Sequence, residues 1–129
     1  MLRSVLAVLA GFLVTGVVTT AMSPGLPIAF LRFSASGDAA PVTDGGELAL
    51  LLAAHGAGVL LGGFTAAALG GRRPLWHALG FAVVLLLAML AGLPEAEARP
   101  AWWLAISFAL APLAALAGGL LARPRPRRA

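Results

Sequence analysis

Four stretches of this chain contain no Asp, Glu, Lys or Arg, and each is long enough to cross a lipid bilayer. They run over residues 5–23, 48–69, 75–93 and 101–122. A helix rises about 1.5 Å per residue, so about 19 to 22 residues span roughly 28 to 33 Å, the thickness of a bilayer core. Hydrophobic residues make up 60% of the 129 residues, more than a soluble domain of this size can bury. The sequence therefore predicts an all-α, polytopic membrane protein with four transmembrane helices.

The charges between these stretches separate by sign if the N-terminus is cytoplasmic. All five acidic residues then fall on the outer side, and only two of the nine basic residues join them. The other seven lie on the inner side, where the positive-inside rule places Arg in short flanks: Arg3, Arg72, Arg73, Arg123, Arg125, Arg127 and Arg128. We expect an antiparallel four-helix bundle with both termini cytoplasmic, in which Arg72, Arg73 and the four Arg of the tail contact lipid headgroups.

The rest of the chain is interpreted as loops of one membrane domain over residues 1–129. Residues 24–46 form an outer interfacial segment and loop, and residues 123–129 form a basic cytoplasmic tail. Two alternatives stay open for the first stretch. It either ends at Ser23-Pro24 or continues as a kinked helix to Leu31, and it is either retained or cleaved as a signal peptide.

The flanks of the third and fourth stretches contain turn and interface signals. Gly70-Gly71-Arg72-Arg73-Pro74 predicts a tight inner turn, with Gly ending one helix and Pro beginning the next. Trp76 lies at the inner start of the third stretch, and Trp102 and Trp103 lie at the outer start of the fourth. We expect these three indoles at the level of the headgroups.

Small residues recur at every fourth position of the second stretch, at Ala54, Gly58, Gly62, Ala66 and Gly70. Such residues let two helix backbones approach closely, which is how packing energy is gained in lipid. Gly and Ala are abundant throughout the chain, so short pairs arise by chance, but five in succession are less expected. This stripe predicts that 48–69 is the central packing helix, and it leaves open whether the partner lies in the same chain or in another copy.

His55 is the only ionisable side chain well inside a predicted span, roughly 12 Å below its outer boundary. Thr19, Thr20 and Ser107 lie at similar depth in other stretches, so the four side chains form a candidate polar cavity. In the functional interpretation His55 binds a proton or a ligand. In the structural one a neutral His55 forms a hydrogen bond with Ser107 or a Thr across the bundle and orders the helices.

Several classes of function are disfavoured by composition and motifs. Cys is absent, and His55 and His77 lie near opposite membrane faces, so no metal site is expected. No hydrolase, protease or P-loop motif is present, and Glu95 and Glu97 lie together only in a charged loop. The tail is short and has no aromatic platform for nucleic acid. We expect no enzymatic activity, no cofactor and no nucleic-acid partner.

The hairpin of the second and third stretches resembles one group of proteins. Leu61-Gly62-Gly63-Phe64-Thr65-Ala66-Ala67, followed by Gly70-Gly71-Arg72-Arg73-Pro74 and His77-Ala78, is similar to small four-helix bacterial membrane proteins. The resemblance covers about 20 residues; it implies the same fold class and a bacterial inner membrane, but no activity and no site residues.

The function expected from the sequence is that of a small integral membrane protein acting through helix packing. Its partners would be the lipid bilayer and either a second copy or another membrane protein that it serves as an accessory subunit. The alternative is a small transporter or channel that uses the outer-half cavity around His55.

Overall fold

The computed structural model describes residues 2–22, 45–71, 73–93 and 99–122, and these residues form four α-helices. Each helix is long and apolar enough to cross a membrane, which confirms the prediction of an all-helical chain with four candidate spans. The helices are α1 (Leu2–Met22), α3 (Gly45–Gly70), α4 (Pro74–Ala91) and α5 (Ala101–Leu121). The loop expected over residues 24–46 ends earlier than predicted, because Gly45 and Gly46 belong to α3; residues 24–44 and the tail over 123–129 lie outside the described residues.

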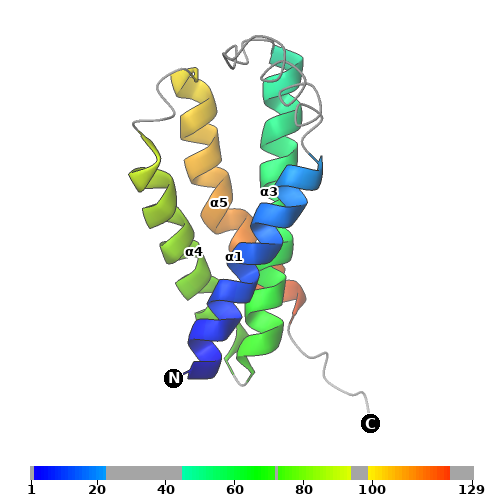
Figure 1. The fold of residues 1–129 in the computed structure, drawn as a ribbon, viewed down its shortest axis with the longest axis vertical. Helices are drawn as coiled ribbons and strands as arrows, with labels where there is room; N and C mark the ends of the chain where they lie inside the picture. The colour runs from blue at the N-terminus through cyan, green and yellow to red at the C-terminus, as the bar shows by residue number, and fades with distance from the viewer. Residues whose placement is uncertain (1, 23–44, 72, 94–98, 123–129) are drawn as a thin grey trace, which may run out of the picture.

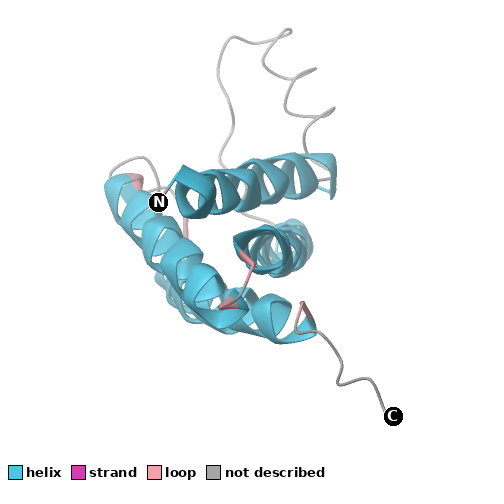
Figure 2. Ribbon diagram, turned by 90° about the horizontal axis from the view of Figure 1, so that it is seen from below, coloured by secondary structure: helices cyan, strands magenta, loops and turns pink. Residues whose placement is uncertain are grey.

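The helix α3 is central, because the two most extensive contacts between helices are those it makes with α1 and with α5, and it also contacts α4. In Figure 1 the colour runs up α1, down α3, up α4 and down α5, and the chain begins at the bottom. Figure 2, seen from below, shows helices gathered around one another and not in a flat layer. We call the lower end, where α1 and α4 begin and α3 and α5 end, the Arg3 end, and the opposite end the Trp103 end.

The contact between α3 and α5 depends on glycines. A Cβ added to Gly63 would lie 2.7 Å from the Cα of Ala115, and one added to Gly118 would lie 2.6 Å from the backbone nitrogen of Phe64. The two backbones therefore touch directly. The core beside this contact contains Val59, fully buried, and larger side chains of α4, including Phe81.

Large apolar side chains cover the outside of the helices. Leu13, Leu87 and Leu113 are 70%, 60% and 67% exposed. In water such a surface would be unstable, whereas in a bilayer it faces lipid at no cost. This distribution agrees with four helices of membrane-spanning length.

The ends of the helices follow local chain chemistry. Gly71 has φ of +90°, a left-handed conformation that suits glycine, and Pro74 begins α4. The Trp103 indole is 6% exposed and donates a hydrogen bond to the Leu48 carbonyl at 3.0 Å. The Trp103 indole thus packs against the first turns of α3, and its place at the level of the headgroups stays a prediction. Trp76 and Trp102 are exposed, at 68% and 48%.

We predict that Gly63→Ala destabilises the protein by about 1–3 kcal/mol, because the added methyl group meets the Ala115 backbone, which cannot move away cheaply. The measurement is the free energy of unfolding in detergent. The matched control is Gly80→Ala, whose added methyl group lies 4.0 Å from the nearest atom, on Val8. Equal stability of the two variants would contradict close backbone contact between α3 and α5.

Candidate functional site

The small-residue stripe of α3 faces α1 in the same chain. Ala54, Gly58, Gly62 and Ala66 are buried. A Cβ on Gly58 would lie 2.9 Å from the Thr15 carbonyl oxygen, and one on Gly62 would lie 2.6 Å from the Gly11 carbonyl oxygen. The question of which helix meets Gly58 and Gly62 is thereby answered: it is α1.

The stripe of α1 that packs against the small-residue stripe of α3 was not predicted from the sequence. Ala7, Gly11 and Thr15 are the buried residues of this helix, and Thr19 follows one turn later, against Gly58. These four residues have the same four-residue spacing as the α3 stripe, so the signal was present in the sequence. It is weaker because two of its members are Thr, which are larger than Gly or Ala.

Thr15 joins the two helices by a hydrogen bond as well as by packing. Its Oγ1 donates to the Gly11 carbonyl of α1 at 2.9 Å and to the Gly58 carbonyl of α3 at 3.1 Å, so one proton is shared between two acceptors. The Thr15 side chain is 6% exposed. Because Gly58 has no side chain, its carbonyl is open to a hydroxyl from the neighbouring helix.

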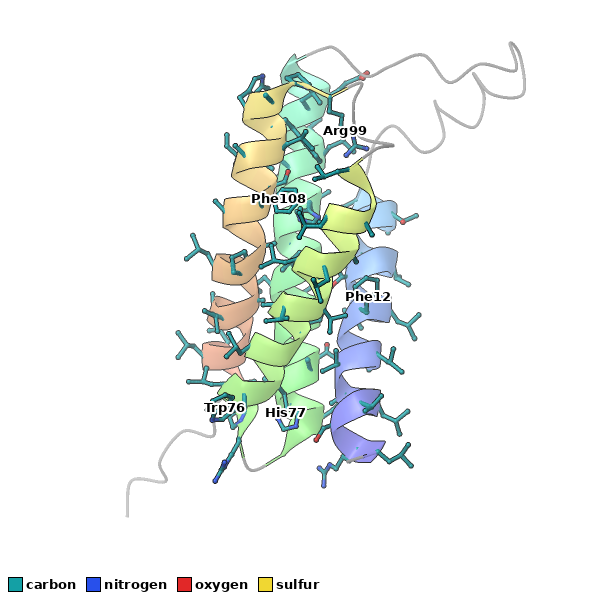
Figure 3. The ribbon with its side chains drawn as sticks, turned by 90° about the vertical axis from the view of Figure 1, so that its left-hand side faces the viewer. Phe12, Trp76, His77, Arg99 and Phe108 are labelled. Atoms are coloured by element: carbon teal, nitrogen blue, oxygen red, sulfur yellow. The ribbon has the colours of Figure 1, made fainter. Side chains whose placement is uncertain are left out.

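Gly70, the last residue of the stripe, faces α4 and not α1. A Cβ there would meet the ring of His77. The His77 Nδ1 donates to the Arg73 carbonyl at 2.9 Å, and in the neutral ring Nε2 accepts from the Ser4 hydroxyl at 3.1 Å. Figure 3 shows His77 and Trp76 together at the Arg3 end. His77 therefore links α4 to α1, and nothing in its contacts indicates catalysis.

The helices α1 and α4 meet at the Arg3 end and part toward the Trp103 end (Figure 1). The parting leaves a hollow of about 520 Å³, which we call the His55 groove, and it lies in the size range of small-molecule sites. Seven of its lining residues come from α1, among them Thr15, Gly16, Thr19 and Thr20, and the other two are His55 of α3 and Leu85 of α4. Three of the four residues of the predicted polar cavity, Thr19, Thr20 and His55, are thus brought together.

Ser107, the fourth residue of that set, does not line the His55 groove. Its side chain is fully buried, at a level between Trp103, whose indole reaches Leu48, and Leu110, which contacts Gly56. Within the described part of the chain, neither Ser107 Oγ nor His55 Nε2 has a hydrogen-bond partner, although both atoms are buried. The suggested hydrogen bond between His55 and Ser107 is therefore wrong: the two side chains occupy the same depth without pairing.

Of the six Arg residues expected to contact lipid headgroups, the structure describes only one. Arg73 is exposed at the Arg3 end, whereas Arg72, Arg123, Arg125, Arg127 and Arg128 lie outside the described residues. At the Trp103 end, the Arg99 guanidinium lies 4.5 Å from the centre of the Trp103 ring, a cation–π contact (Figure 3 labels Arg99). Among the described residues, no three His, Cys, Asp or Glu side chains form a group that could hold a metal ion.

The chain matches no protein family, no curated protein and no solved structure. The resemblance of residues 61–78 to small four-helix bacterial membrane proteins stays a prediction.

We predict that Thr15→Val lowers the free energy of unfolding by about 0.6 to 1.7 kcal/mol, because it removes the interhelix hydrogen bond to Gly58 and keeps the side-chain shape. Thr65→Val is the matched control, since the Thr65 hydroxyl donates only within its own helix, to the Leu61 carbonyl at 2.8 Å. Detergent unfolding measured by circular dichroism gives both values. A loss no larger for Thr15→Val than for Thr65→Val would show that the Gly58 bond adds nothing.

Proposed function

We propose that this chain is a non-enzymatic integral membrane protein that acts by packing against a further transmembrane helix, from a second copy or from a protein that it serves as an accessory subunit. In this proposal the four helices form an antiparallel bundle in a bacterial inner membrane. Both termini are cytoplasmic, the Arg3 end faces the cytoplasm and the Trp103 end faces outward. The distribution of Arg over the flanks supports this orientation.

The observation that carries the proposal is the parting of α1 and α4. Nothing lies within 4 Å of a Cβ added to Gly16, and Gly16 lines the His55 groove. A glycine beside open space lets another helix approach as closely as Gly58 and Gly62 let α1 approach α3. Thr20 and His55 line the same groove, and polar side chains at membrane depth favour a polar partner.

The stripe on α3 is not available for this contact, because Gly58 and Gly62 are already covered by Thr15, Thr19 and Gly11. Enlarging Gly58 or Gly62 would therefore damage the fold before it affected any association. The face proposed for a partner is the groove between α1 and α4.

We predict that Gly16→Leu abolishes association while the chain still folds, because the leucine projects into the space that the partner helix would fill. The measurement is native mass spectrometry of the protein extracted gently from its own membrane, which reports copy number and partner chains together. Ala109→Leu, an equal enlargement at an exposed position of α5, is the control and leaves the assembly intact. The same stoichiometry in both variants, or a single chain in the wild type, would refute the proposal.

A second candidate function, a small transporter or channel, is favoured by one observation: the buried His55 Nε2 has no hydrogen-bond partner among the described residues. An imidazole in this state can accept a proton or a hydrogen bond from a passing substrate.

We predict for this candidate that His55→Leu abolishes proton flux into liposomes loaded with a pH-sensitive dye, while membrane insertion and assembly are unchanged. Ser107→Ala is the matched control, because Ser107 is buried at the same depth outside the groove. Flux that persists in His55→Leu, or that is absent from the wild type, would remove the transporter hypothesis and leave the packing proposal standing.

A further inference from the structure

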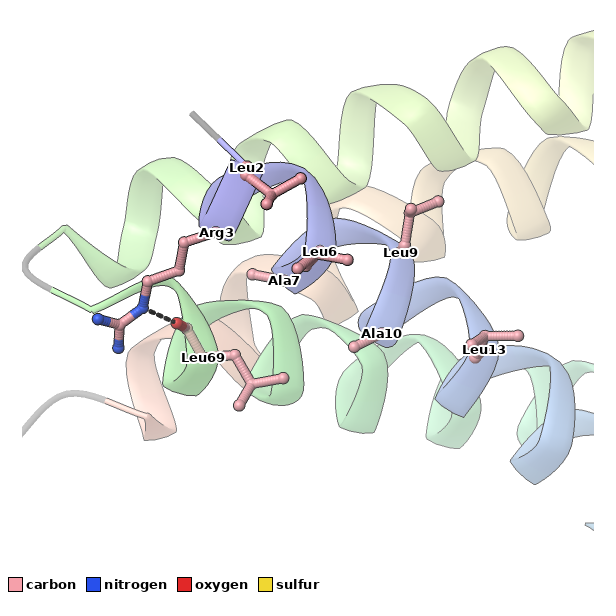
Figure 4. A pocket seen from close by; sticks show the side chains of 8 residues that line it. All are labelled: Leu2, Arg3, Leu6, Ala7, Leu9, Ala10, Leu13 and Leu69. Carbon is pink, nitrogen blue, oxygen red and sulfur yellow. Dashed lines mark hydrogen bonds between the residues drawn. The ribbon is translucent and has the colours of Figure 1, made fainter.

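A second groove runs along α1 and α3 at the Arg3 end. It is a hollow of about 690 Å³, which we call the Arg3 groove, and Figure 4 shows it from close by. Its walls are leucines, with Leu2, Leu6, Leu9 and Leu13 from α1 and Leu69 from α3. Ala7 and Ala10 make up the rest of the lining apart from Arg3. The Arg3 groove is thus apolar along its whole length and positively charged only at one end.

A hydrogen bond holds the Arg3 guanidinium at that end. Its Nε donates to the Leu69 carbonyl at 3.0 Å, drawn as a dashed line in Figure 4. The Leu69 carbonyl belongs to the last turn of α3, where the helix dipole is negative and a cation is favourable. In Figure 4 the two terminal nitrogens of Arg3 point away from this carbonyl. They carry four further N–H donors.

No carboxylate of the described residues neutralises Arg3. Glu47 is the one Asp or Glu within 2–22, 45–71, 73–93 and 99–122, and it lies in the first turn of α3, at the opposite end of that helix. The exposed Arg73 adds a second positive charge at the Arg3 end. The groove therefore combines a leucine-lined channel with an unneutralised cation held at its mouth.

We propose that the Arg3 groove binds an anionic phospholipid, with the phosphate on the terminal nitrogens of Arg3 and one acyl chain along Leu2, Leu6 and Leu9. The positive charge of Arg3 favours a lipid over a transmembrane helix in this groove. A transmembrane helix covering this groove would bury the guanidinium without a counter-charge, whereas a lipid phosphate supplies one at the depth where headgroups lie. A guanidinium also suits phosphate, because its N–H groups match two phosphate oxygens at once.

The test is native mass spectrometry of the full chain released from nanodiscs of phosphatidylglycerol or of phosphatidylcholine. The wild type retains one phosphatidylglycerol and no phosphatidylcholine. Arg3→Gln lowers this retention about fivefold, the effect of one cation near the headgroups. Arg3→Lys restores most of it, since the charge returns. Arg73→Gln is the matched control, because Arg73 is exposed at the same end and does not line the groove, and it leaves retention near the wild-type value.

A second variant tests the groove without changing charge. Ala10→Phe fills the channel beside Leu6 and Leu13 and lowers phosphatidylglycerol retention while Arg3 stays in place; it also carries the test if Arg3→Gln fails to fold. Equal losses in Arg3→Gln and Arg73→Gln would mean diffuse attraction by surface charge and would overturn the proposal. Equal retention of the two lipids, or no retained lipid in the wild type, would overturn it as well. None of these outcomes depends on the His55 groove.

Discussion

The close approach of α1 to α3 is the contact on which the rest of the structure depends. Lipid offers helices no hydrophobic reason to associate, so the energy must come from packing and from hydrogen bonds between helices. At Gly11 and Gly62 the two backbones are so near that a methyl group would collide with the opposite carbonyl. Thr15 adds a hydrogen bond across the same contact. Once α1 and α3 are joined in this way, the remaining faces of α3 are left for α4 and α5.

The opposite face of α3 follows the same principle with different residues. Gly63 meets the Ala115 backbone, and Gly118 meets Leu60 and Phe64. With α1 and α5 both held at backbone distance, α4 is packed mainly through side chains, Phe81 above all, which is fully buried. Packing through large side chains fixes the relative position of two helices less strictly than direct contact between backbones at glycines. This difference explains how α4 can diverge from α1 toward the Trp103 end and open the His55 groove.

The number and length of the helices follow from the sequence, whereas the choice of which helix packs against which does not. Long uncharged stretches predict helices of spanning length, because length and hydropathy are properties of one segment. The direction in which Gly58 points is a property of two segments, so the spacing of small residues shows a packing face without showing its partner. The stripe at Ala7, Gly11 and Thr15 was not predicted, because Thr is polar as well as small and its spacing alone does not distinguish a packing face from a polar one. The partner of Trp103 is likewise a property of two segments: its position at a helix start predicts a level in the membrane, and only the fold shows that the Leu48 carbonyl of α3 lies within reach.

The candidate site was predictable to a similar degree. Depth along a helix is readable from sequence, and it correctly grouped Thr19, Thr20 and His55. The sequence does not predict on which side of α3 each of these residues lies. Ser107 lies outside their groove because α5 packs on a different face of α3 from α1. The grouping of His55 with Thr19 and Thr20 of α1, and the separation of Ser107 from them, both follow from the central place of α3 in the bundle.

The fold divides its polar side chains into two sets. Thr15, His77 and Trp103 each form a hydrogen bond with another helix, and these bonds add to the glycine packing that holds the bundle together. His55 Nε2 and Ser107 Oγ have no partner among the described residues, and the Arg3 guanidinium uses one N–H and turns the others outward. Burying a polar atom unpaired costs free energy, and this cost applies to His55 and Ser107 but not to Arg3, which is exposed. His55 lines one groove and Arg3 the other, so a partner can reach both residues, whereas the glycine stripes are already covered by neighbouring helices.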